Sequence, residues 1–253
     1  MSIALASARL ESRRLARSGL LLGLIAAFFC LGLSGPLLAL YLPEILGAAS
    51  GSGQSTIDAA PATAAGALMM FNQSAMQLGL ILAAAVAITA LSWDARPGSS
   101  IFYRVRLRHL SQLTVPRLAT DWAVVSASYA LGLALAVGLT TATIGQVPWD
   151  LTLRVGLASI PYLVMSMAIG HLIMTFTRRT ASAISVAAIL LIVLPVLSQV
   201  PFLSSWFPTT LLSAATATGA DLVWPAFTAV ALTVACVVAA SLIATRQSLR
   251  RDA

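Results

Sequence analysis

Residues 92–122 read SWDARPGSSIFYRVRLRHLSQLTVPRLATDW and separate two long apolar runs. The stretch holds five of the fifteen basic residues of the chain, all of which are arginines. Pro97 and Gly98 predict the end of the preceding apolar helix. A short helix is expected to follow Gly98 and to end at Pro116. A short basic helix held just outside a bilayer by two membrane spans is typical of a docking element.

The composition predicts an all-α, polytopic membrane protein. Hydrophobic residues make up 59% of the 253 residues, charged residues make up 9%, and the mean hydropathy is +0.93. Several apolar runs reach the length of about 20 residues that crosses a bilayer. We expect a single transmembrane domain over residues 1–253 with six transmembrane helices, near residues 20–42, 66–93, 118–144, 155–176, 181–200 and 225–245.

The arginines predict the orientation of these spans. With a cytosolic amino terminus, the cytosolic segments hold fourteen arginines and the outer segments hold only Arg154. Cytosolic loops of membrane proteins are enriched in basic residues, so both termini are expected in the cytosol. The basic charge is therefore a sign of topology, and no nucleic-acid partner is expected.

The same orientation gives each connecting segment a side of the membrane. Residues 1–18 are expected to form an amphipathic helix on the cytosolic surface, with its arginines toward lipid headgroups. Residues 93–118 face the cytosol, and residues 43–65 form an outer loop. Residues 201–222 combine prolines with aromatic side chains, which predicts short helices that re-enter the outer leaflet.

The second predicted span begins with a cluster of polar side chains: Asn72, Gln73, Ser74 and Gln77. Such a cluster indicates either hydrogen bonding between helices or a substrate path. Asn72 points about 100° away from Gln73, so the amides cannot all face one direction. We expect at least one amide to face a neighbouring helix and another to face a pathway.

The sequence disfavours catalysis, metal binding and ion-coupled transport by this chain alone. Ser34 in a Gly-x-Ser-Gly sequence would need a base such as His171, but the two are expected at different depths. No cluster has metal-ligand spacing. The carboxylates, Asp121 among them, are expected at span ends, which disfavours an ion-coupled carrier. The chain has no lysine for a P-loop, so a partner would have to supply energy.

Four stretches carry a family resemblance: RLESRRLARS at residues 9–18, FNQSAMQLGLILA at 71–83, WDARPGSSIFYRVR at 93–106 and PRLATDW at 116–122. In this order they resemble the membrane (permease) subunits of type-2 ABC exporters. Family members usually carry a glutamate followed by Gly-Thr or Gly-Ser. Here Asp94 stands in place of the glutamate, and Gly98 and Ser99 follow it.

The resemblance implies a permease subunit that has no catalytic activity and binds no cofactor. Residues 98–110 would form a coupling helix, and residues 3–17 an elbow helix. Separate cytosolic ATPase subunits would bind ATP and Mg²⁺ and dock on Asp94, Gly98, Ile101, Phe102, Arg104, Val105 and Arg108. A second permease subunit would complete a homodimer or a heterodimer among the membrane lipids.

The expected function is export of a lipid-like, drug-like or other amphipathic substrate from the cytosol across a bacterial-type plasma membrane. Asn72, Gln73 and Gln77 are the expected substrate path. The alternative is a membrane scaffold or assembly factor that does not transport and uses the same basic helix to recruit a cytosolic protein. An ATPase that co-purifies with the chain would distinguish the two functions.

Overall fold

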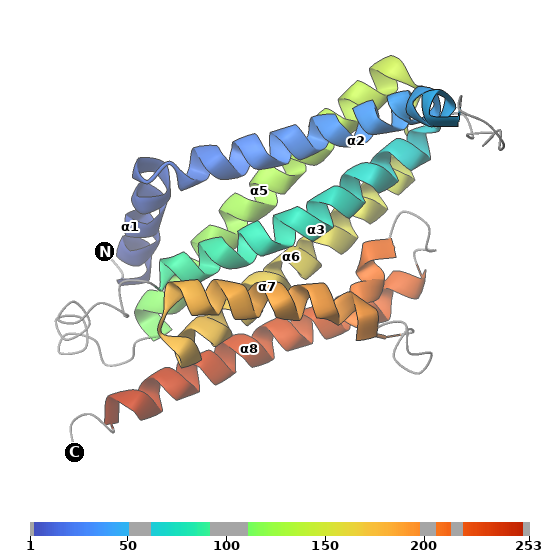
Figure 1. Ribbon diagram of the computed structural model, residues 1–253. Coiled ribbons are helices and arrows are strands. Elements are labelled where there is room, and N and C mark those ends of the chain that lie inside the picture. Colours follow the sequence, from blue (N-terminus) through green and yellow to red (C-terminus); the bar gives the residue numbers. More distant parts are fainter. Residues whose placement is uncertain (1–2, 51–61, 92–110, 198–205, 214–219, 250–253) are drawn as a thin grey trace.

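The computed structural model describes residues 3–50, 62–91, 111–197, 206–213 and 220–249, and these residues contain helices and no strand. The helices are α1 (Ile3–Arg17), α2 (Leu20–Ser50), α3 (Ala64–Ala90), α5 (Ser111–Thr143), α6 (Trp149–Thr177), α7 (Thr180–Leu197) and α8 (Val223–Leu249), with two short 3₁₀ helices, η1 (Pro208–Ser213) and η2 (Ala220–Leu222). Figure 1 shows the long helices side by side, with α1 across one end of the bundle.

Five of these helices are long and apolar enough to cross a membrane. They are α2, α3, α5, α6 and α8, with mean hydropathies between 1.6 and 2.4 in their most apolar windows. The apolar part of α7, Thr180–Val196, is shorter. The all-α, multi-pass class predicted from composition is thus confirmed, with five candidate spans in place of the six expected.

Glycines allow α2 and α5 to pack closely. A Cβ atom on Gly132 of α5 would lie 2.5 Å from the Phe28 carbonyl oxygen, and one on Gly32 of α2 would lie 2.5 Å from the Gly132 oxygen. Phe28 is fully buried, and its ring lies edge-on to the Tyr129 ring at 5.9 Å between centroids. Small residues at helix contacts permit this approach in membrane proteins, and the contact holds α5 against α2.

Three predicted boundaries are wrong. The outer loop was expected from residue 43, but α2 contains Pro43 and continues to Ser50. Pro116 was expected to end a helix, but it lies inside α5. The fourth span was expected from residue 155, but α6 already begins at Trp149, directly after the extended residue Pro148. Prolines are tolerated in packed membrane helices because neighbouring groups can satisfy the freed backbone atoms.

The amino-terminal segment is helical as predicted, and one of its faces is buried by the protein itself. Ser7, Glu11 and Leu15 of α1 are almost completely buried. The Ser7 hydroxyl donates a hydrogen bond of 2.8 Å to the Leu113 carbonyl oxygen of α5. Gly19, with a positive φ of 72°, allows the sharp turn from α1 into α2. One face of α1 is therefore packed against the bundle.

The turns of the second half follow the sequence-based expectation more closely. The α6–α7 turn consists of Arg178 and Arg179, and Arg178 adopts the left-handed conformation with φ of 54°. Short helices were expected within residues 201–222, and η1 and η2 confirm them; residues 201–205 and 214–219 lie outside the described part. In Figure 1, α1, the α6–α7 turn and the end of α8 share one end of the bundle, and η1 lies toward the other.

Candidate functional site: an amide-lined cavity

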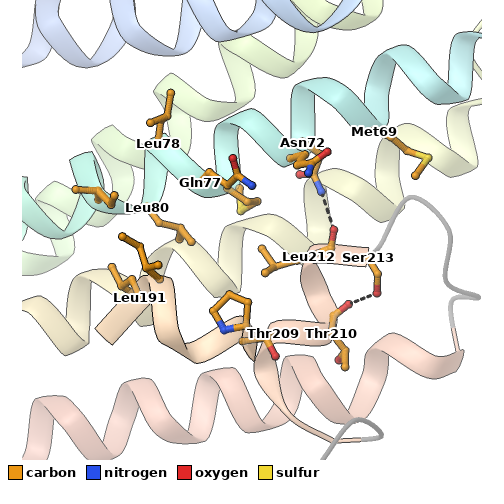
Figure 2. A pocket seen from close by; sticks show the side chains of 15 residues that line it. Met69, Asn72, Gln77, Leu78, Leu80, Leu191, Thr209, Thr210, Leu212 and Ser213 are labelled. Atoms are coloured by element: carbon orange, nitrogen blue, oxygen red, sulfur yellow. Dashed lines mark hydrogen bonds between the residues drawn. The ribbon is translucent and has the colours of Figure 1, made fainter. Parts of the chain in front are cut away.

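A cavity of about 760 Å³ opens between α3, the second half of α7 and η1. Figure 2 shows α3 on one side of it and the Thr209–Ser213 segment of η1 on the other. Its walls consist of apolar, amide and hydroxyl side chains: Met69, Asn72, Gln73, Met76, Gln77, Leu78, Leu80, Ile81, Leu191, Ile192, Pro195, Thr209, Thr210, Leu212 and Ser213. None of these side chains is charged. All three residues of the predicted substrate path line this cavity.

Asn72 is buried, and both the oxygen and the nitrogen of its amide have hydrogen-bond partners in the protein. Its Oδ1 accepts hydrogen bonds from the Ser159 hydroxyl at 2.9 Å and the Tyr129 hydroxyl at 3.3 Å. Its Nδ2 donates to the Leu212 carbonyl oxygen at 3.3 Å, the bond drawn in Figure 2. These bonds join α3 to α5, α6 and η1. Asn72 therefore positions η1 at the cavity wall.

Gln73 and Gln77 differ from Asn72 in that their side chains are exposed at the cavity. They lie one helical turn apart on α3. Neither side-chain amide makes a hydrogen bond to another described residue. The expectation that the amides divide between a neighbouring helix and an open space is thus met in the geometry, while their part in transport stays a prediction.

The floor of the cavity at η1 adds hydroxyl groups. Thr210 Oγ1 donates to the Phe207 carbonyl oxygen at 2.8 Å, and Ser213 Oγ donates to the Thr210 carbonyl oxygen at 2.7 Å. Thr209 is only 3% exposed, and its Oγ1 has no hydrogen-bond partner within the described ranges. A buried hydroxyl without a partner is costly in a protein interior, so a ligand that reached Thr209 would relieve this cost.

A second polar site, the charged junction, joins α1 to the bundle. We define it as Glu11 and Arg14 of α1 with Arg117 and Asp121 of α5. Glu11 forms a salt bridge with Arg14, and the Arg117 Nε lies 3.9 Å from the Glu11 Oε2. Arg14 Nη1 also donates a hydrogen bond of 2.7 Å to the Thr89 carbonyl oxygen near the end of α3.

Asp121 completes the charged junction and is fully buried. It is close enough to Glu11, Arg14 and Arg117 for electrostatic interaction with each. The sequence-based placement of Asp121 at the end of a span missed this burial, because α5 already begins at Ser111. Two spacings could have indicated the site: Glu11 and Arg14 are three residues apart, and Arg117 and Asp121 are four apart.

The remaining predicted residues fall elsewhere. All seven docking residues, Asp94, Gly98, Ile101, Phe102, Arg104, Val105 and Arg108, lie outside the described residues. Ser34 is exposed on α2, and its hydroxyl donates to the Leu31 carbonyl oxygen of its own helix. His171 is buried in α6. Within the described ranges no group of three or more His, Cys, Asp or Glu side chains could hold a metal ion.

No protein-family model, curated protein or solved structure matches the chain. The fold and the cavity thus define its class by themselves. It is a helical protein of the multi-pass membrane type, with an uncharged cavity at one end of its bundle and a buried charged junction at the other.

Proposed function

We propose that this chain is the transmembrane permease subunit of an ATP-driven exporter of the type-2 ABC class. The observation that carries the proposal is the cavity, where the amides of Gln73 and Gln77 are exposed among apolar side chains and have no hydrogen-bond partner within the described part of the chain. Such groups are costly against lipid alone. A passing amphipathic substrate would satisfy them.

The distribution of arginines supports the orientation in this proposal. Arg14, Arg17, Arg117 and the Arg178–Arg179 turn belong to elements that meet at one end of the bundle, whereas Arg154 lies in the first turns of α6. By the positive-inside rule the first end faces the cytosol. We assign α7 as the sixth span, since 17 apolar residues are within the range that crosses a bilayer. Both termini are then cytosolic.

The charged junction supports a mechanical role for α1. The α5 helix begins at Ser111, directly after the predicted coupling helix, residues 98–110. The junction ties α5 to α1 and, through Thr89, to α3, which carries Gln73 and Gln77. A force applied by a docked ATPase to the coupling helix would thus reach both the elbow helix and the cavity wall.

The complete exporter in this proposal contains two permease subunits and two cytosolic ATPase subunits in a bacterial-type plasma membrane. ATP and Mg²⁺ bind to the ATPase subunits, and this chain does no chemistry itself. The substrate leaves the cytosol by a path that includes the cavity.

Reversal of Arg104 and Arg108 to glutamate tests the docking step. We expect the R104E/R108E variant to reach the membrane, because other cytosolic arginines keep the orientation, and to lose at least about 90% of the co-purified ATPase, since a docked acidic surface would meet like charge. The measurement is affinity purification followed by mass spectrometry and ATP hydrolysis assay.

The matched control reverses Arg178 and Arg179, which lie in the α6–α7 turn at the same end of the bundle. It should retain the ATPase. Normal ATPase recovery with R104E/R108E would show that these arginines only set topology. Recovery of a cytosolic protein without ATPase activity would favour the scaffold function instead.

A further inference from the structure

We infer that the cavity binds an uncharged amphipathic molecule, with an apolar chain and a head that carries hydroxyl, ester or amide groups. The inference deepens the proposed function and rests on it for the statement that this molecule is the exported substrate. Binding itself depends only on the cavity. The argument comes from the charge, the hydrogen-bonding capacity and the shape of the lining.

The absence of charge among the lining residues selects against ionised heads. A carboxylate, phosphate or ammonium group that left water for this cavity would lose hydration and gain no oppositely charged partner from the lining. The buried carboxylate and guanidinium groups of the described residues, at Glu11, Arg117 and Asp121, are at the other end of the bundle. An uncharged head avoids this cost.

The available hydrogen-bonding groups fit such a head. Each glutamine amide offers two donor hydrogens and one acceptor oxygen, and a threonine hydroxyl offers both functions. Gln73 and Gln77 supply the amides on α3, and Thr209 supplies the buried hydroxyl on η1. Because these groups come from two elements on different sides of the cavity, a head with several hydroxyl or carbonyl groups could bond to both.

The rest of the cavity fits an apolar chain. Seven of the fifteen lining residues are leucine, isoleucine or methionine of α3 and α7, and methionines adapt readily to varied apolar shapes. Leu78 and Ile192 are each 62% exposed, so the rim of the cavity is apolar where it opens. A volume of about 760 Å³ is within the usual range for sites that bind small molecules.

The test uses three photoactivatable probes that share one alkyl chain and differ in the head: a monoacylglycerol, a fatty acid and an alkyltrimethylammonium. Each is added to the purified full-length chain in lipid nanodiscs without an ATPase, and labelled peptides are identified by mass spectrometry. We expect the monoacylglycerol to label α3 and η1 peptides at least about fivefold more than either charged probe, and unlabelled monoacylglycerol to compete.

Two changes in the cavity sharpen the test. The double variant Q73L/Q77L should lower monoacylglycerol labelling about tenfold, the value of two modest hydrogen bonds. Q77E, with nearly the same shape, should shift the preference toward the cationic probe. Q146L is the matched control, because Gln146 is an exposed glutamine in the α5–α6 connection and outside the cavity; its labelling should equal that of the unaltered chain.

Equal labelling by the three probes would overturn the inference, as would unchanged labelling in Q73L/Q77L together with an unchanged preference in Q77E. These outcomes are separate from a failure of the proposed function. If the neutral probe binds as expected but no ATPase associates with the chain, the exporter proposal fails and the binding site stands. If an ATPase associates and the probes bind equally, only the substrate class is wrong.

Discussion

The charged junction and the cavity place polar side chains at opposite ends of one apolar bundle, and they differ in how those side chains are satisfied. In the junction, Glu11 pairs with Arg14 and Arg117, and Arg14 also bonds to the Thr89 carbonyl oxygen. The Asp121 carboxylate has no hydrogen-bond partner among the described residues, but it lies within electrostatic reach of Arg14 and Arg117. In the cavity, Gln73 and Gln77 have no partner among the described residues. The difference teaches that the charges of the junction hold helices together, whereas the Gln73 and Gln77 amides join no helices and are open to the ligand that we propose.

Asn72 tests this distinction because it lines the cavity, but its side chain, like those of the junction, bonds to neighbouring elements. Its amide forms hydrogen bonds with the Ser159 and Tyr129 hydroxyls and the Leu212 carbonyl oxygen, so both its oxygen and its nitrogen already have protein partners. Position in a cavity wall therefore does not separate candidate binding residues from structural ones. Among the three amides, the presence or absence of protein hydrogen-bond partners separates them.

The largest expected effect is on the charged junction. Replacement of Arg117 by methionine keeps much of the apolar stem but leaves the buried Glu11 and Asp121 carboxylates with only Arg14. Removal of one partner from a buried ion pair costs about 3–5 kcal/mol. We expect a large fall in the melting temperature of the purified chain in detergent, measured by intrinsic fluorescence or calorimetry.

The control for this prediction is Arg154→Met. Arg154 pairs with Asp150 at 3.1 Å on the surface of α6, and exposed ion pairs contribute about 0–1 kcal/mol. The double variant R117M/E11Q should recover part of the stability lost in Arg117→Met, because it also removes one buried negative charge. Equal melting temperatures for Arg117→Met and Arg154→Met would show that the junction does not hold α1 to the bundle.

The next effect in size separates the amides of the cavity from one another. Asn72→Leu leaves two hydroxyls and one carbonyl oxygen without their partner, and we expect a loss of about 2 kcal/mol of folding stability. Gln73→Leu and Gln77→Leu break no bond within the described structure, so each should change stability by less than about 0.5 kcal/mol. Thermal unfolding of the three variants measures the order, and an equal loss in all three would contradict the division.

Local features of the sequence predicted much of the fold. Apolar runs located the long helices, and the short gap between the predicted spans 155–176 and 181–200 located the α6–α7 turn. The aromatic and proline content of residues 201–222 predicted the short helices. Prolines misled, because Pro43 and Pro116 break helices in water but are tolerated where neighbouring helices satisfy the backbone. The extents of α2 and α5 therefore could not be obtained from local signals.

The candidate site was predictable only in part. The spacing of Asn72, Gln73 and Gln77 on one helix indicated that the amides divide between packing and an open space. The partners of Asn72 come from α5, α6 and η1, and Glu11 meets Arg117 across more than 100 residues of chain, so neither arrangement has a local signature. Nothing in the sequence distinguishes Thr209 from other threonines, because its burial without a hydrogen-bond partner is visible only in the structure.

The smallest expected effect concerns Thr209. Its replacement by valine should have opposite effects on folding stability and on probe labelling. In the empty cavity its buried hydroxyl has no partner, so Thr209→Val removes an unsatisfied group and should leave stability unchanged or raise it by up to about 1 kcal/mol. With the monoacylglycerol probe, the lost hydrogen bond should lower labelling about threefold.

Thr228→Val is the control, because the Thr228 hydroxyl donates to the Trp206 carbonyl oxygen at 2.7 Å and its loss should be destabilising. Parallel melting curves and probe titrations give both quantities. Destabilisation by Thr209→Val with normal labelling would place Thr209 with the structural group that includes Asn72.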